Sequence, residues 1–164
     1  MTATLTSTGS TAAVIVTHQR AELLRASLEQ VVHQTHPVQW VVVVDNGAED
    51  AVRELVESMA GDRGVYVPSE TNLGGAGGFA LGFLTALSLG ADAVWCADDD
   101  GRPADHTVLA ELYRVAEANR LHEVSPAVCN INDPGRLAFP LRQGLVWRRR
   151  MDELEGDFLP GIAS

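Results

Sequence analysis

The sequence predicts an α/β fold built on an open, mainly parallel sheet with helices on its faces. Short continuous apolar runs occupy residues 12–17, 40–44, 65–67 and 93–97. Runs that do not alternate with polar residues are typical of strands buried on both faces. Helical patterns separate these runs, and strands that alternate with helices form right-handed βαβ units. In such a sheet, ligands bind beyond the carboxyl ends of the strands.

The elements follow one another in a regular order. Apolar residues recur at the spacing of one helical face between and after the apolar runs, which predicts helices within residues 24–32, 52–59, 79–87 and 109–116. Polar segments follow the first, second and fourth runs, at residues 17–20, 45–47 and 98–100. We expect these three segments to lie together at one edge of the sheet.

Residues 73–91 allow a second interpretation, because 19 residues without a charge are long enough to span a bilayer. The GxxxG spacing of Gly74, Gly78 and Gly82 also occurs between transmembrane helices. However, the segment holds six glycines and has acidic flanks without a basic residue nearby. We therefore favour a helix buried against the sheet.

Composition limits the class of protein. The chain has 164 residues, of which 46% are hydrophobic and 21% charged, as in a soluble globular domain. Twelve basic residues stand against 22 acidic ones, for a net charge of −10, which argues against general nucleic-acid binding. Cys96 and Cys129 have neither disulfide nor zinc-site spacing. We expect both to be small buried residues in a reducing compartment.

Three segments are expected along the chain. Residues 1–11 are rich in Thr and Ser and predict a disordered tail. Residues 12–130 form the predicted α/β domain. Residues 131–164 are interrupted by Pro and Gly, which predicts an irregular segment.

The acidic triplet Asp98-Asp99-Asp100 is the strongest local signal for chemistry. Three carboxylates in a row repel one another unless a cation or solvent offsets their charge. Two carboxylates together with substrate phosphates suit Mg²⁺ or Mn²⁺. The alternative is a solvated acidic turn, and spacing alone leaves both interpretations open.

Two further signals are the glycine-rich segment from Asn72 to Phe79 and Asp45. Glycines at the start of a helix let backbone N–H groups approach a phosphate, or let the helix lie close to the sheet. The spacing of Gly75, Gly77 and Ala80 also fits a dinucleotide fingerprint, but this fingerprint should follow the first strand. Asp45 could accept a hydrogen bond from a base or a ribose, or could close an Asx turn.

The order of these motifs resembles a known family. The motifs that carry the resemblance are ValIleValThrHisGlnArg (14–20), ValValValValAspAsnGly (41–47), AsnLeuGlyGlyAlaGlyGlyPhe (72–79) and AlaAspAspAsp (97–100). The chain resembles the nucleotide-sugar half of inverting family-2 glycosyltransferases with the GT-A fold, and this half is Rossmann-like. The glycine run with the triple Asp is similar to actinobacterial galactofuranosyltransferases that begin cell-wall galactan. This resemblance implies transfer of galactofuranose from UDP-galactofuranose to a rhamnosyl-GlcNAc polyprenyl diphosphate acceptor.

The resemblance also implies roles for matching residues. Thr17 would lie beside the uracil and Asp45 would bind the base. Asp98 would contact the ribose or the metal through water, and Asp100 would coordinate Mn²⁺ or Mg²⁺. The remaining residues implied at the sugar-nucleotide cleft are Asn72, Gly74, Gly75 and Asp99.

Family members continue well past Ser164, so the acceptor-binding half and the catalytic base are expected beyond it, and the base stays unknown. Loss of that half would expose apolar surface and favour a homo-oligomer. A polyprenyl-linked acceptor implies a cytoplasmic protein at the inner face of the plasma membrane. The alternatives are a transferase of another nucleotide sugar, such as dTDP-rhamnose, and a non-catalytic transferase-like module.

Overall fold

The computed structural model describes residues 4–154 and divides into two compact units, Met1–His122 and Glu123–Ser164. Unit 1 holds an open four-stranded sheet, and unit 2 holds a three-stranded one. The division falls at residue 122, which differs from the expected boundary at residue 130.

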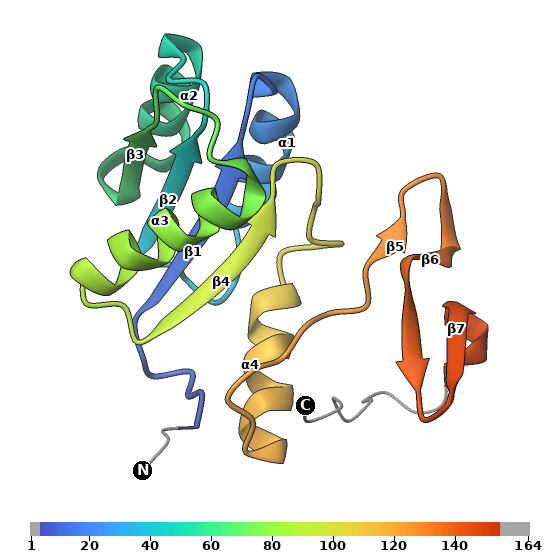
Figure 1. Cartoon of the computed structure of the whole chain (residues 1–164). Coiled ribbons are helices and arrows are strands. Elements are labelled where there is room, and N and C mark those ends of the chain that lie inside the picture. The colour runs from blue at the N-terminus through green and yellow to red at the C-terminus, as the bar shows by residue number, and fades with distance from the viewer. Residues whose placement is uncertain (1–3, 155–164) are drawn as a thin grey trace. The chain divides into compact units, whose positions relative to one another are not determined.

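The sheet of unit 1 consists of four strands that match the four apolar runs. These are β1 (Thr11–Thr17), β2 (Trp40–Asp45), β3 (Gly64–Pro68) and β4 (Ala93–Asp98). All pairings are parallel, and the strand order is β3-β2-β1-β4. The carboxyl ends of all four strands therefore meet at one edge of the sheet, called the carboxyl edge below (Figure 1).

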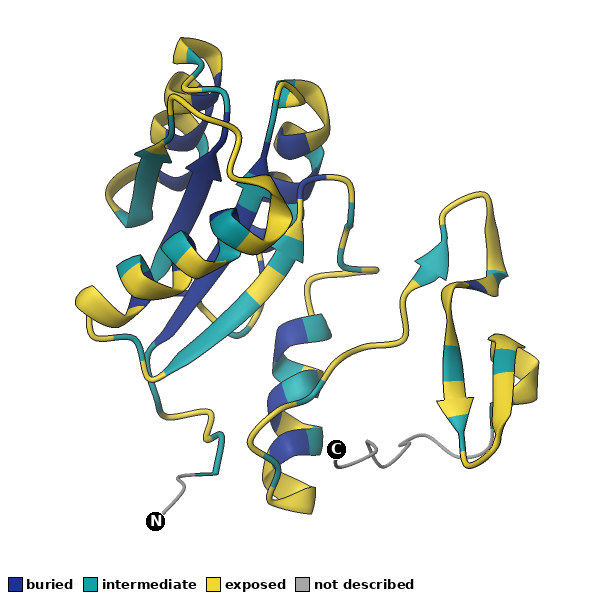
Figure 2. Cartoon of the chain, viewed as in Figure 1, coloured by how far each residue is buried: buried dark blue, intermediate teal, exposed yellow. Residues whose placement is uncertain are grey.

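Four helices cover the two faces of this sheet, which confirms the predicted α/β class. Residues of α1 (Ala21–Val32), α2 (Asp50–Ala60) and α4 (Val108–Asn119) pack in one hydrophobic cluster with alternate residues of β1 and β2. The other residues of these strands form a second cluster with α3 (Gly74–Ser88). Because β1 and β2 are covered on both sides, they are the most deeply buried strands (Figure 2).

Helix α3 lies on the sheet through small residues. Gly78, Gly82 and Ala86 are its buried residues and are spaced by four, so they share one face of the helix. A Cβ atom at Gly82 would lie 2.3 Å from Cγ1 of Val14, so only glycine allows this approach. The segment thus forms a helix against the sheet, as expected. Within residues 4–154, no helix is both long enough and apolar enough to cross a membrane.

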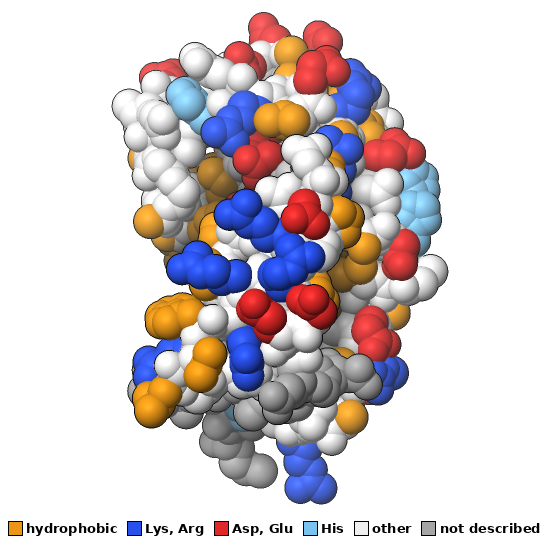
Figure 3. Space-filling model, turned by 90° about the vertical axis from the view of Figure 1, so that its right-hand side faces the viewer, with side chains coloured by type: hydrophobic (Ala, Val, Ile, Leu, Met, Phe, Trp, Pro, Cys, Tyr) orange, Lys and Arg blue, Asp and Glu red, His pale blue; other side chains and the backbone are white. Residues whose placement is uncertain are grey.

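Unit 2 contains an antiparallel sheet where the sequence predicted an irregular segment. Its strands are β5 (Cys129–Asn130), β6 (Asp133–Gln143) and β7 (Val146–Arg150), and a 3₁₀ turn, η2 (Met151–Glu153), follows. Gly144, with φ 61°, lies in the turn between β6 and β7. Basic and apolar side chains are exposed on this hairpin, among them Leu145 and Trp147, and Figure 3 shows arginine side chains gathered near hydrophobic ones.

Two smaller expectations differ from the structure. Residues 4–10 of the expected disordered tail are described and bonded: the N–H of Leu5 donates to the carbonyl of Leu121, and Ser7 donates to Glu117. Neither cysteine is buried, since Cys96 is exposed and Cys129 is half-buried. Cys96 lies on β4, an edge strand of the sheet, so that side chains on this strand are less covered than those on β1.

Candidate functional site

The acidic triplet forms a turn directly after β4, and the end of β1 holds its middle residue. The hydroxyl of Thr17 donates a 2.9 Å hydrogen bond to Oδ2 of Asp99, and both side chains are buried. Strands β1 and β4 are neighbours, with Val16 paired to Asp98, so sheet register brings these residues together. Asp99 therefore joins the two strand ends and points inward, whereas Asp98 and Asp100 are exposed.

Helix α1 fixes the same turn in two further places. The Oγ atom of Ser27, which is fully buried, lies 3.0 Å from the carbonyl oxygen of Asp98 and 3.1 Å from that of Gly101, so one hydroxyl hydrogen serves two acceptors. Arg20 precedes the helix, and its Nη1 donates to Oδ1 of Asp99 at 3.3 Å and to Oδ2 of Asp100 at 3.2 Å. These bonds fix the backbone of the turn and the buried side chain of Asp99, while the carboxylates of Asp98 and Asp100 face solvent.

The environment of the acidic triplet disfavours the ionised form of Asp98. Partial loss of water around Asp98, and then the charges of Asp100 and Asp99, raise the pKa of the Asp98 carboxyl above its usual value. A nearby cation would reverse this effect by stabilising the ionised form. The Arg20 guanidinium supplies one positive charge to Asp99 and Asp100.

Asp45 lies at the end of β2 but is fully buried. Its Oδ1 accepts a hydrogen bond from the N–H of Gly47 at 2.8 Å, and its Oδ2 accepts from the N–H of Glu49 at 2.7 Å and the hydroxyl of Tyr66 at 3.0 Å. Burial and the bond to Asp45 raise the pKa of Tyr66 to about 12. Asp45 thus closes the loop into α2, as in the Asx-turn interpretation.

The start of α3 is held by Asn46, which is buried at the end of β2. Its Nδ2 donates to the carbonyl of Gly74 at 3.3 Å, and its Oδ1 accepts from the N–H of Leu73 at 3.3 Å. Asn72 Oδ1 accepts from the N–H of Gly74 at 2.8 Å, and Gly74 has φ 66°, a conformation that favours glycine. Nothing lies within 4 Å of a Cβ placed at Gly75, so the helix start is open on that side.

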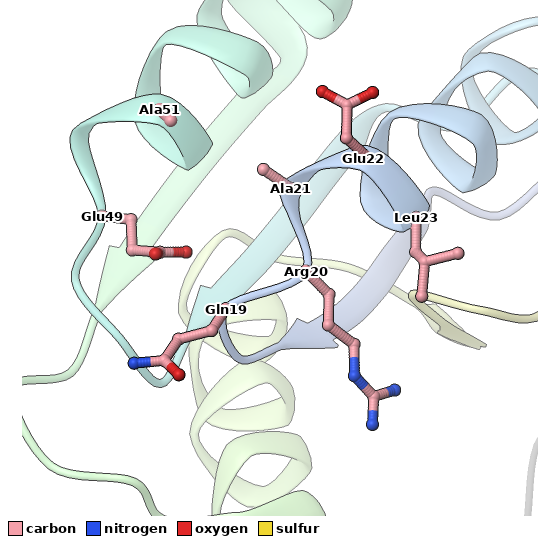
Figure 4. A pocket seen from close by; sticks show the side chains of 7 residues that line it. All are labelled: Gln19, Arg20, Ala21, Glu22, Leu23, Glu49 and Ala51. Carbon is pink, nitrogen blue, oxygen red and sulfur yellow. The ribbon is translucent and has the colours of Figure 1, made fainter.

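A shallow cavity of about 370 Å³ opens at the carboxyl edge between the loops that follow β1 and β2. Gln19, Arg20, Glu22 and Glu49 line it together with Ala21, Leu23 and Ala51. Figure 4 shows the Arg20 side chain pointing away from both Glu22 and Glu49. Gln19 adopts φ 56°, unusual for a residue with a side chain, at the bend between β1 and α1.

The structure brings the sequence-predicted residues together in two groups along the carboxyl edge. Thr17, Asp98, Asp99 and Asp100 lie at the ends of β1 and β4, while Asn72, Gly74 and Gly75 lie at the start of α3. Sequence reasoning missed Arg20 and Ser27, which tie the acidic turn to α1, and Asn46, which ties the start of α3 to the end of β2. Of these, Arg20 and Asn46 stand in polar segments that follow predicted strands, and this position is the signal that could have found them.

The donor set fits a hard divalent cation, with two exposed carboxylates on one short turn. Within the part of the chain that the structure describes, no group of three His, Cys, Asp or Glu side chains converges as a metal site. Any cation at this turn would therefore need oxygen atoms from a ligand or from water to complete its coordination shell.

Comparisons with known proteins agree with this architecture. The profile of Glycosyl transferase family 2 matches residues 12–162. The chain is 56% identical to Galactofuranosyltransferase GlfT1 of Mycolicibacterium smegmatis, over 98% of this chain and 55% of that protein. It is also 56% identical to GlfT1 of Mycobacterium tuberculosis, over 96% of this chain and 53% of that protein. The chain thus spans about half the length of the curated relatives it matches.

Solved structures share the fold at low sequence identity. The mannosyltransferase PcManGT from Pyrobaculum calidifontis, in complex with GDP-Man and Mn²⁺, gives a TM-score of 0.53 at 21% identity, over 78% of this chain and 38% of that one. S. aureus TarS 1–349 in complex with UDP gives 0.56 at 17% identity, over 76% and 43%. These likenesses show that the chain shares the fold of GT-A transferases. With the profile match over most of its length, the chain belongs to glycosyl transferase family 2.

Proposed function

We propose that this chain forms the donor-binding portion of a galactofuranosyltransferase that uses UDP-galactofuranose. The observation that supports this most strongly is the 56% identity to two mycobacterial galactofuranosyltransferases over nearly the whole chain. The acceptor proposed is a polyprenyl-diphosphate-linked rhamnosyl-GlcNAc glycan, and the proposed place of action is the inner face of the plasma membrane.

The carboxyl edge suits a nucleoside diphosphate sugar. Asn46 ties the open start of α3 to the end of β2, and Thr17 ties Asp99 to the end of β1. Because β1 and β2 are adjacent, the helix start and the acidic turn face the same edge. Backbone N–H groups at a helix start favour phosphate oxygens, so Gly74 and Gly75 are proposed beside the diphosphate, with Asn72 next to them.

Asp98 and Asp100 are the residues proposed to hold Mn²⁺ or Mg²⁺. When bound, the ion would neutralise negative charge on the departing diphosphate. Thr17 and Asp99 bond to each other, so we propose that they shape the cleft and contact the nucleotide only at its margin. Asp45 is proposed to act through the loop that it closes, because both its oxygens already accept hydrogen bonds.

No general base is proposed among the described residues. Glu153 in unit 2 accepts hydrogen bonds from the N–H groups of Arg149 and Arg150, and these bonds lower the pKa of its carboxyl. Asp152 pairs with Arg150 at 3.5 Å. Both carboxylates therefore bond to the backbone or side chains at the end of β7. Asp157, a third carboxylate of this part of the sequence, lies outside the described residues.

Thermal unfolding with UDP and Mn²⁺ tests the proposal. A ligand at one hundred times its dissociation constant stabilises the native state by about 2.7 kcal/mol, which raises the melting temperature of a chain this size by about 5–10 °C. Asp98→Ala and Asp100→Ala should abolish this rise. Asp62→Ala removes the same charge at η1 (Gly61–Arg63), which precedes β3, and should keep it. A full rise in both site variants would refute the metal assignment.

Two alternatives remain open to the same assay. A panel that includes UDP-galactofuranose and dTDP-rhamnose separates a different donor from the proposed one. Absence of any shift, together with a stable dimer in size-exclusion chromatography, would favour a non-catalytic module. Exposed Phe139, Leu145 and Trp147 offer apolar surface for such self-association, which remains a prediction.

A further inference from the structure

Arg20 is shared between two carboxylates that differ strongly in exposure. The side chain of Asp99 is 8% exposed and that of Asp100 is 58% exposed, while Arg20 itself is 52% exposed. A single nitrogen, Nη1, reaches both carboxylates, at 3.3 and 3.2 Å. The guanidinium therefore has one partner inside the fold and one at its surface.

The ion pair of Arg20 with Asp100 is easier to break than its ion pair with Asp99. Asp99 is fixed by the bond from Thr17 and has little water to replace a lost partner. Asp100 is exposed, and an ion pair at the surface contributes little and is screened by salt. The contact is also a single-nitrogen one, without the two parallel bonds that make arginine–carboxylate pairs strong. The Asp100 contact is thus the one that a competing cation could displace.

We propose that Arg20 is the internal counter-ion of the acidic turn. Its guanidinium pairs with Asp100 until a divalent cation binds that carboxylate. The inference rests on the proposed function, because it takes Asp100 as a metal ligand. Arg20 is a positioning residue in this account. Thr17 and Ser27 hold the turn without Arg20, so the effect of Arg20 is to neutralise part of the triplet's charge and thereby to lower the affinity of the turn for a cation that arrives alone.

This role has a signature opposite to that of a purely structural residue. Removing a structural support should weaken cation binding, whereas removing a competing charge should strengthen it. The strength of an exposed ion pair predicts an effect of about 1.4- to fivefold, since such pairs contribute about 0.2–1 kcal/mol. The direction of the change, more than its size, therefore tests the assignment.

The experiment titrates the full chain with Mn²⁺ alone at low salt and follows free Mn²⁺ by electron paramagnetic resonance. Arg20→Gln and Arg20→Met should bind Mn²⁺ about 1.4- to fivefold more tightly than wild type. Arg25→Gln is the matched control, because it removes the same charge from an exposed position on α1 and should leave the affinity unchanged. Thermal melts select the variants that unfold cooperatively, and either neutral variant suffices.

The outcomes separate this inference from the proposed function. Equal or weaker Mn²⁺ binding by a folded Arg20 variant overturns the counter-ion role, even where wild type binds Mn²⁺ with UDP. An equal gain in Arg25→Gln also overturns it, because the gain would then reflect net charge. If wild type and variants bind no Mn²⁺ with or without UDP, the metal site and the counter-ion role both fail.

Discussion

Gly82→Ala tests how α3 is held against the sheet. The added Cβ would lie 2.3 Å from Cγ1 of Val14 and 3.3 Å from Cγ2 of Val44. Carbon atoms in contact are normally about 3.5–4.0 Å apart, so helix and strand must separate locally by roughly 1.2 Å or more. Val14 is fully buried on β1 and has a stiff, branched side chain, so it cannot turn aside cheaply.

The magnitude follows from two opposing effects. Overpacking a core typically costs about 1–3 kcal/mol, and a displacement above 1 Å belongs at the upper end. Replacing glycine with alanine inside a helix returns about 1 kcal/mol. The expected net loss in the free energy of unfolding is therefore about 2 kcal/mol, which corresponds to a melting temperature about 6 °C lower.

Urea unfolding followed by circular dichroism measures this loss, and Gly75→Ala is the control in the same helix. A Cβ at Gly75 meets no atom within 4 Å, so this variant should be as stable as wild type or slightly more stable. If Gly82→Ala is as stable as wild type while Gly75→Ala behaves as expected, then close packing by glycine does not hold α3 in place.

Three further changes probe the site and its supports. Asp98→Asn should raise the melting temperature without divalent cations, because it relieves repulsion in the triplet, and should remove the rise caused by UDP and Mn²⁺; a rise equal to that of wild type would contradict the assignment. Tyr66→Phe removes a donor to the buried carboxylate of Asp45 and should cost about 1–2 kcal/mol in urea unfolding; no loss would mean that water replaces the hydroxyl. Bonds from the N–H and hydroxyl of Ser7 lower the pKa of Glu117, so its stabilisation is present above the unfolded pKa of 4.5 and is lost as pH falls through the lower folded value. Wild type should therefore melt above Glu117→Gln at pH 7, and the gap should close towards pH 3; a gap that is constant with pH would refute this.

The sheet could be predicted from sequence because its strands are marked by local composition. Valine runs such as residues 41–44 are buried on both faces, and this burial produces the continuous apolar pattern. The hairpin of β6 and β7 escaped prediction because Pro134 and Pro140 interrupt it and both lie exposed on a strand of a small sheet. Local pattern thus predicts the buried sheet better than the exposed one.

The site could be predicted only as a set of residues, without its connections. The acidic triplet and the glycines are visible as local motifs. The bond from Thr17 to Asp99 spans 82 positions and that from Asn46 to Gly74 spans 28, so both depend on which strands become neighbours. Asp45 shows the reverse case: its local Asx turn was foreseen as an alternative, and its bond with Tyr66 on β3 follows from the pairing of β2 with β3.

The N–H of Leu5 donates to the carbonyl oxygen of Leu121 at 3.1 Å, so the chain near the start of unit 1 lies beside the chain near its end. A chain segment that enters and leaves at the same point can be cut out, reconnected in a different order or given a long insertion without stretching its interior. Protein engineers could therefore exchange unit 1 between transferases as a cassette, with junctions before residue 5 and after residue 122.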